Sequence, residues 1–154
     1  NAIAFRLQWL EKPADEIENM LAATPDPARR TWRREMIENG TDSQLFVNAV
    51  WAYDTLLEDM ECALQDRDWL AGDAYTLADV SLTSYLNRVA ELQFQPMWEI
   101  NRPRVTDWFA RIRARGNFRI AFGNYLYDDY AAQMAEQGAL RWPRVQAILA
   151  AYSP

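Results

Sequence analysis

The stretch that most constrains the fold of this chain is residues 69–92, which read WLAGDAYTLADVSLTSYLNRVAEL. Gly72 marks a turn, and Thr76 and Asp79 then stand at the spacing of a helix capping box. In such a box the Thr76 hydroxyl accepts a hydrogen bond from the backbone N–H of Asp79, and the Asp79 carboxylate accepts one from the backbone N–H of Thr76. Residues 80–86 carry no charge. We therefore expect a capped helix at the centre of the fold.

Helical periodicity continues through the rest of the chain. Its clearest example is a stripe of apolar residues spaced by three and four positions, made of Phe46, Val50, Tyr53, Leu57, Met60 and Leu64. Turn and capping signals predict helices that start at residues 13 and 27, a longest helix from 41 or 42 to about 66, and helices over 76–92, 103–115, 124–137 and from 142. In the helix that starts at residue 27, we expect Trp32, Met36 and Ile37 to point inward. Residues 93–100 are read as a connector. The pattern predicts one compact bundle of about seven helices.

Composition narrows the function classes. The 154 residues suit one domain over residues 1–154, and the net charge of −6 disfavours nucleic acid and anionic membranes as partners. There is no His, which removes the commonest metal ligand and general base, so no metal site is expected. No apolar run reaches the roughly 20 residues of a membrane span. The single cysteine, Cys62, fits a reducing, cytoplasmic location, and Asn1 and Ala2 fit a cloning remnant.

Two motifs carry a family resemblance. Gly72-Asp73, Thr76-x-x-Asp79 and the Leu-rich helix behind them resemble the C-terminal domain of the glutathione transferase superfamily, and so does the segment RPRVTDWFARI at residues 102–112. The likeness covers about residues 41–122 well and 3–40 loosely. It departs from the family at Gly116, where many members carry Pro. The resemblance implies an all-α, single-domain orthogonal bundle of about six to eight helices.

The same resemblance implies where the chemistry lies. The family's N-terminal thioredoxin-like domain binds glutathione and activates its thiol, and this all-helical sequence has no room for that domain. We therefore expect the chain to be the substrate-binding and dimerisation domain of an enzyme that conjugates or reductively cleaves small hydrophobic electrophiles with glutathione. The chain alone is expected to have little activity, with no catalytic residue of its own, and to form a homodimer. The alternatives are a non-catalytic helical interaction module and a small-ligand carrier.

Candidate substrate-binding residues come from the family's pocket, which the first helices of this domain line. They are Phe5, Arg6, Trp9 and Trp51. The alternative interpretation is that these side chains only pack within the protein. Weaker candidates are Tyr125, Tyr127 and Trp142.

Two other features are read mainly as structural. Arg29, Arg30, Arg33 and Arg34 form a basic cluster that could bind an anion, but we favour a solvated face paired with Glu35 and Glu38. Cys62 has acidic neighbours and no His to activate it, which argues against a nucleophile. Thr76 and Asp79 are read as a structural cap rather than a catalytic pair.

Overall fold

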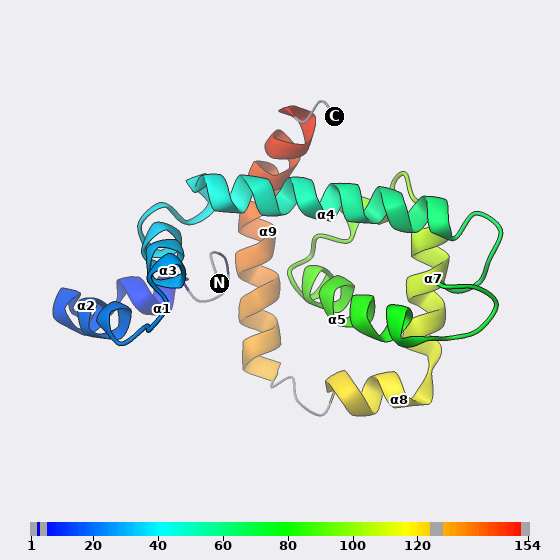
Figure 1. The fold of residues 1–154 in the computed structure, drawn as a ribbon, viewed down its shortest axis with the longest axis horizontal. Coiled ribbons are helices and arrows are strands. Elements are labelled where there is room, and N and C mark those ends of the chain that lie inside the picture. Colours follow the sequence, from blue (N-terminus) through cyan, green and yellow to red (C-terminus); the bar gives the residue numbers. More distant parts are fainter. Residues whose placement is uncertain (1–2, 4–5, 124–127, 152–154) are drawn as a thin grey trace. The chain divides into compact units, whose positions relative to one another are not determined.

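The computed structural model describes residue 3, residues 6–123 and residues 128–151, and the fold of this part is all-α (Figure 1). Its helices are α1 (Arg6–Leu10), α2 (Ala14–Ala22), α3 (Pro27–Asn39), α4 (Gln44–Ala63), α5 (Leu77–Glu91), α6 (Pro96–Glu99), α7 (Pro103–Ala114), α8 (Gly116–Phe118) and α9 (Asp128–Ala151). A 3-10 turn (Gly40–Asp42) precedes α4, and a π-helical turn (Arg119–Gly123) follows α8. Within the described residues the only strand-like pairing is an isolated bridge between Trp69 and Gly72.

The chain divides into two compact units, residues 1–52 with 143–154 and residues 53–142. Helices α4 and α9 contribute to both units. The single domain over residues 1–154 stays a prediction.

The unit of residues 53–142 is built on aromatic and aliphatic side chains that water does not reach. Trp98, Val105, Trp108 and Ile112 are each at most 1% exposed. In this unit the predicted apolar stripe is buried at Leu57, Met60 and Leu64, and Tyr53 is half-buried. Full burial of one large apolar side chain contributes about 1.5–3 kcal/mol, so these residues supply much of the folding free energy of this unit.

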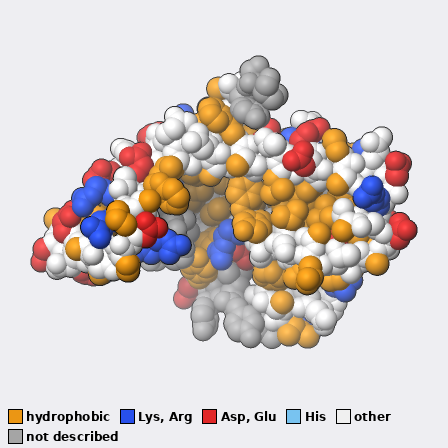
Figure 2. Space-filling model, in the orientation of Figure 1, with side chains coloured by type: hydrophobic (Ala, Val, Ile, Leu, Met, Phe, Trp, Pro, Cys, Tyr) orange, Lys and Arg blue, Asp and Glu red, His pale blue; other side chains and the backbone are white. Residues whose placement is uncertain are grey.

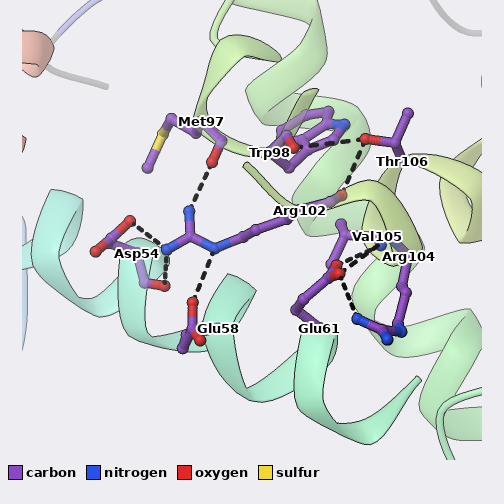
Figure 3. A network of polar contacts seen from close by, with 9 residues as sticks. All are labelled: Asp54, Glu58, Glu61, Met97, Trp98, Arg102, Arg104, Val105 and Thr106. Atoms are coloured by element: carbon purple, nitrogen blue, oxygen red, sulfur yellow. Dashed lines mark hydrogen bonds and ion pairs between the residues drawn. The ribbon is translucent and has the colours of Figure 1, made fainter. Parts of the chain in front are cut away.

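The first turn of α7 is held by carboxylates of α4 (Figure 3). The Glu61 carboxylate accepts from the backbone N–H groups of Arg104 (3.2 Å) and Val105 (2.9 Å). Arg102, which precedes α7, donates to Asp54 Oδ1 (2.8 Å) and to the Met97 carbonyl (2.6 Å). The start of α7 has no side-chain cap of its own, so Glu61 supplies from another helix what a local Ser or Asp usually supplies.

Helix α9 corrects the prediction of two separate helices near the C-terminus. It runs unbroken from residue 128 to 151 and includes both Gly138 and Pro143. A Cβ at Gly138 would lie 1.9 Å from the Leu92 carbonyl oxygen, so glycine is needed there for the close approach of the two backbones and does not end the helix. The predicted start of this region, residues 124–127, lies outside the described residues.

Helix α5, whose residues 80–86 carry no charge, is buried on one side only. Its buried line consists of Asp79, Thr83, Leu86 and Val89, at helical spacing. The other side is open, with Leu77 80% and Tyr85 54% exposed, and hydrophobic side chains gather over α4 and α5 on the face shown in Figure 2. The predicted connector at residues 93–100 contains the short helix α6, whose Trp98 is buried.

Candidate functional site

A cavity of about 790 Å³ lies in the unit of residues 1–52 and 143–154, between α1, α2, α3 and the start of α4. Most of its wall is apolar and aromatic. The apolar wall consists of Trp9, Met20, Trp32, Met36, Ile37 and Leu45. Cavities of this size and character hold drug-sized organic molecules, with indole rings and flexible Met side chains as contact surface.

Three arginines complete the wall of this cavity, and none of them pairs with a carboxylate within the described residues. Arg6 donates from Nε to the Ile37 carbonyl (2.9 Å) and from Nη2 to the Glu38 carbonyl (2.8 Å). Arg33 donates to the Thr24 hydroxyl (2.9 Å). Arg29 is exposed and makes no hydrogen bond or ion pair with any described residue.

Gly40 sets the position of Arg6. It has a φ of +55°, a conformation that favours glycine, and a Cβ there would lie 2.7 Å from Cδ and Nε of Arg6. Gly40 therefore both ends α3, as its C-cap, and leaves room for the guanidinium of Arg6 at the cavity wall.

The basic cluster of α3 divides into two pairs of side chains. Arg29 and Arg33 line the cavity. Arg30 donates to the Thr24 carbonyl (2.9 Å), and Arg34 forms a two-pronged contact with Glu18 at 2.6 and 2.8 Å. The hydrogen bond from Arg34 lowers the pKa of Glu18, and the same contact raises the pKa of Arg34.

The expected pairing of this cluster with Glu35 and Glu38 is therefore largely replaced by other partners. Glu38 reaches Arg34 only at 3.9 Å, whereas the main acidic partner of Arg34 is Glu18 on α2. The pairing of Arg34 with Glu18 depends on how α2 and α3 pack, so the local sequence does not reveal it.

The structure brings together two of the four candidate substrate-binding residues. Arg6 and Trp9 line the cavity. Trp51 does not line it; its indole Nε1 donates to the Ile148 carbonyl (3.4 Å) on α9. Phe5 lies outside the described residues, as do Tyr125 and Tyr127. Trp142 packs against Phe94, with ring centroids 5.6 Å apart.

Trp32 was expected to point inward, but its side chain is 57% exposed and lines the cavity. Sequence reasoning placed it in the core because an indole at helical spacing next to Met36 usually packs there. The sequence signal that could have indicated a ligand surface is the presence of Trp32 together with several arginines on one helix. The structure agrees, because α3 has no buried residue.

The Asp79 carboxylate, in the other unit, lies at the centre of a closed hydrogen-bond network. Its Oδ1 accepts from the Leu70 backbone N–H (3.0 Å) and the Trp108 indole Nε1 (2.8 Å). Its Oδ2 accepts from the backbone N–H (2.9 Å) and the hydroxyl (3.2 Å) of Thr76. Thr76 and Asp79 form the capping box of α5, and the side chain of Asp79 is completely buried.

The network explains the protonation state of Asp79. Burial raises the pKa of its carboxyl, but the hydrogen bonds from Leu70, Trp108 and Thr76 outweigh burial and hold the pKa below the ordinary value. The Asp79 carboxylate is completely buried, and both of its oxygens already accept hydrogen bonds from the protein, so its role is structural.

No helix in the described part of the chain is long and apolar enough to cross a membrane. Among the same residues, no group of three or more Cys, Asp or Glu side chains is arranged to hold a metal ion.

Comparisons with known proteins agree with this fold. Residues 32–116, more than half of the chain, match the family model of the glutathione S-transferase C-terminal domain. Glutathione S-transferase TCHQD of Arabidopsis thaliana is 29% identical over 70 residues, which is 46% of this chain and 26% of that protein. Elongation factor 1-gamma-B of Xenopus laevis is 32% identical over 92 residues, 60% of this chain and 20% of that protein.

The tetrachloro-p-hydroquinone reductive dehalogenase of Sphingobium chlorophenolicum is 31% identical over 65 residues, 42% of this chain and 26% of that protein. The matched stretches thus span between a fifth and about a quarter of these relatives' lengths. No solved structure matches the chain.

Proposed function

Because the chain belongs to the family of glutathione S-transferase C-terminal domains, we propose that its 790 Å³ cavity binds the hydrophobic substrate of a glutathione transferase-like enzyme. The reaction would conjugate a small electrophile with glutathione or cleave it reductively. The observation that carries this proposal is the cavity wall, in which Trp9 and Trp32 offer planar contact surface to an aromatic molecule. The name of one relative, a reductive dehalogenase of a chlorinated hydroquinone, supports an aromatic substrate, and the name of another, a glutathione S-transferase, supports a reaction with glutathione.

The thiol chemistry would come from a thioredoxin-like partner domain with glutathione as co-substrate. The described residues that line the cavity include no Ser, Tyr, Cys or acidic side chain, so they offer neither a nucleophile nor a general base. Cavity residues would hold the electrophile, and the partner domain would supply the activated thiolate.

Substrate binding is tested by calorimetry on the chain with a neutral aromatic, 2-naphthalenemethanol. The Trp32→Ala variant should bind it about fivefold more weakly, because one indole face is lost from the cavity. Since Trp32 is exposed, the variant should fold normally. The control is Trp51→Phe, which keeps a ring at a position outside the cavity wall and should bind as the unchanged chain does. Equal loss in both variants, or no binding at all, would contradict the proposal.

The assignment of catalysis to a partner domain has its own test. The chain alone, mixed with glutathione and a chlorinated aromatic, should give no turnover above the uncatalysed rate. Measurable turnover would place a thiol-activating group within this chain, and the assignment of catalysis to a partner domain would then be wrong.

We also propose that the chain forms a homodimer. Leu7, Leu10 and Trp32, on the early helices, are more than a third exposed, and apolar surface of this kind favours self-association. Sedimentation should show a dimer, and a monomer at all concentrations up to the solubility limit would contradict this.

A second candidate function is a helical protein-interaction module. The similarity to elongation factor 1-gamma-B over 60% of the chain favours it, as does the open apolar side of α5, with Leu77, Val80 and Tyr85. A module of this kind would use α5 and leave the cavity empty, so failure of the calorimetric test above would favour it over the enzyme.

A further inference from the structure

We propose, on the basis of the function proposed above for the same cavity, that its ligand is an aromatic molecule bearing an oxyanion, such as a carboxylate, sulfonate or phenolate. The ring would lie against the indoles, and the oxyanion would be bound by Arg29 and Arg33, with Arg6 adding positive charge.

The charge of the cavity wall is the first support. Among the described residues, its lining contains three arginines and no acidic residue, although the chain as a whole carries a net charge of −6. Elsewhere in the described chain, arginines such as Arg34, Arg102 and Arg104 pair with carboxylates. The wall of this cavity is therefore a local concentration of positive charge that no described acid neutralises.

The free hydrogen-bonding capacity of these arginines is the second support. A guanidinium has five N–H donors in a fixed plane. Arg29 uses none of them on a described residue, and the partners of Arg33 are the Thr24 hydroxyl and the Met20 sulfur, both neutral. Two neighbouring arginines one helical turn apart can bind the oxygens of one oxyanion by charge-assisted hydrogen bonds.

The fixed position of Arg6 is the third support. Its two hydrogen bonds go to carbonyls in the last turn of α3, at the negative end of that helix. Gly40 keeps the space beside it open. Arg6 is thus ordered before any ligand arrives, which lowers the entropy cost of binding.

The experiment compares two probes that share a ring and differ in charge, 2-naphthalenesulfonate and 2-naphthalenemethanol, by calorimetry on the full chain. We expect the sulfonate to bind about tenfold more tightly at low salt, and this preference to shrink as ionic strength rises, because the arginines are partly exposed. In the Arg29→Gln/Arg33→Gln variant the sulfonate should lose about tenfold in affinity, while the neutral alcohol changes by less than about twofold.

The matched control is Arg67→Gln/Arg119→Gln, which removes the same charge from exposed positions in the other unit. It should leave the affinity for both probes unchanged. Equal affinity of the two probes for the unchanged chain, or equal loss of sulfonate affinity in the control, would overturn the inference. If the alcohol binds and responds to Trp32→Ala while charge has no effect, the proposed function stands and only the anion preference fails. If neither probe binds, both fail.

Discussion

The Asp79 network and the arginine-lined cavity both place charged side chains beside aromatic rings. They differ in whether those charged side chains have partners within the protein. Asp79 is 0% exposed and accepts four hydrogen bonds from Leu70, Thr76 and Trp108. Arg29 is exposed and has no partner among the described residues. The Asp79 carboxylate has both oxygens occupied by donors of the protein, whereas the guanidinium of Arg29 keeps its donors available to solvent or a ligand.

This difference supports a structural role for Asp79 and the proposed binding role for the cavity arginines. A buried charge that lacks partners destabilises a protein, so the fold must satisfy Asp79 internally. An exposed charge costs little when unpaired, because water solvates it, and it stays available to a ligand. Mutations should therefore affect stability at Asp79 and ligand affinity at the cavity arginines.

The largest effect on stability is expected for Asp79→Ala. The substitution leaves the Leu70 N–H, the Thr76 N–H and the Trp108 indole N–H without an acceptor, and each buried unpaired donor costs about 1–3 kcal/mol. After partial relaxation we expect a loss of about 3–5 kcal/mol, measured by urea unfolding. The exposed Asp73→Ala control should change stability by less than about 0.5 kcal/mol. If Asp79→Ala lost no more stability than Asp73→Ala, the structural role of Asp79 would be contradicted.

A smaller loss is expected for Trp108→Phe. The substitution keeps a ring in the core and removes the N–H that donates to Asp79 Oδ1 at 2.8 Å. We expect about 1–2 kcal/mol from the lost hydrogen bond to a charged group, together with a small cavity. In the Asp79→Ala background the hydrogen-bond part of the loss should disappear, and purely additive effects in this double-mutant cycle would argue against a direct contact.

Low pH should destabilise the fold, because it protonates the Asp79 carboxylate at the centre of the same network. The pKa of the Asp79 carboxyl is below its ordinary value in the fold, so its stabilising contribution is complete above that ordinary value, about 3.9, and is lost as pH falls from there through the folded-state pKa. The free energy of unfolding should therefore decrease below about pH 4, and less steeply in Asp79→Asn. Parallel pH profiles for the two proteins would show that another group is responsible.

The smallest effect on stability is expected for Arg29→Gln, at the cavity. The side chain has no partner within the described residues, so the free energy of unfolding should change by less than about 0.5 kcal/mol. A loss of more than about 1 kcal/mol in thermal or urea unfolding would show that this arginine supports the fold, and the contrast with Asp79 would fail.

Local signals predicted the helical fold well. The capping box of α5 involves residues three positions apart, and the α4 stripe follows one helix face, so both can be read from neighbouring letters. Features that depend on distant contacts could not be read in this way. Gly138 looked like a helix end because its packing against Leu92 is invisible in sequence, and the Trp108 donor lies 29 residues from Asp79.

The cavity was only partly predictable. Arg6 and Trp9 were found from the family resemblance, but Trp32 was expected in the core, although its side chain is 57% exposed and lines the cavity. A pattern of apolar residues shows that a helix has a preferred face, but it does not show whether that face meets protein or a ligand.

The seven tryptophans offer the most direct test of the account. Each indole N–H gives one resonance in a nitrogen-proton correlation spectrum, assignable by single Trp→Phe variants. On titration with 2-naphthalenesulfonate we predict that the signals of Trp9 and Trp32 shift, while that of Trp108, buried against Asp79, stays in place. A shift of Trp108 with Trp9 and Trp32 unchanged would contradict the separation of ligand cavity and structural network.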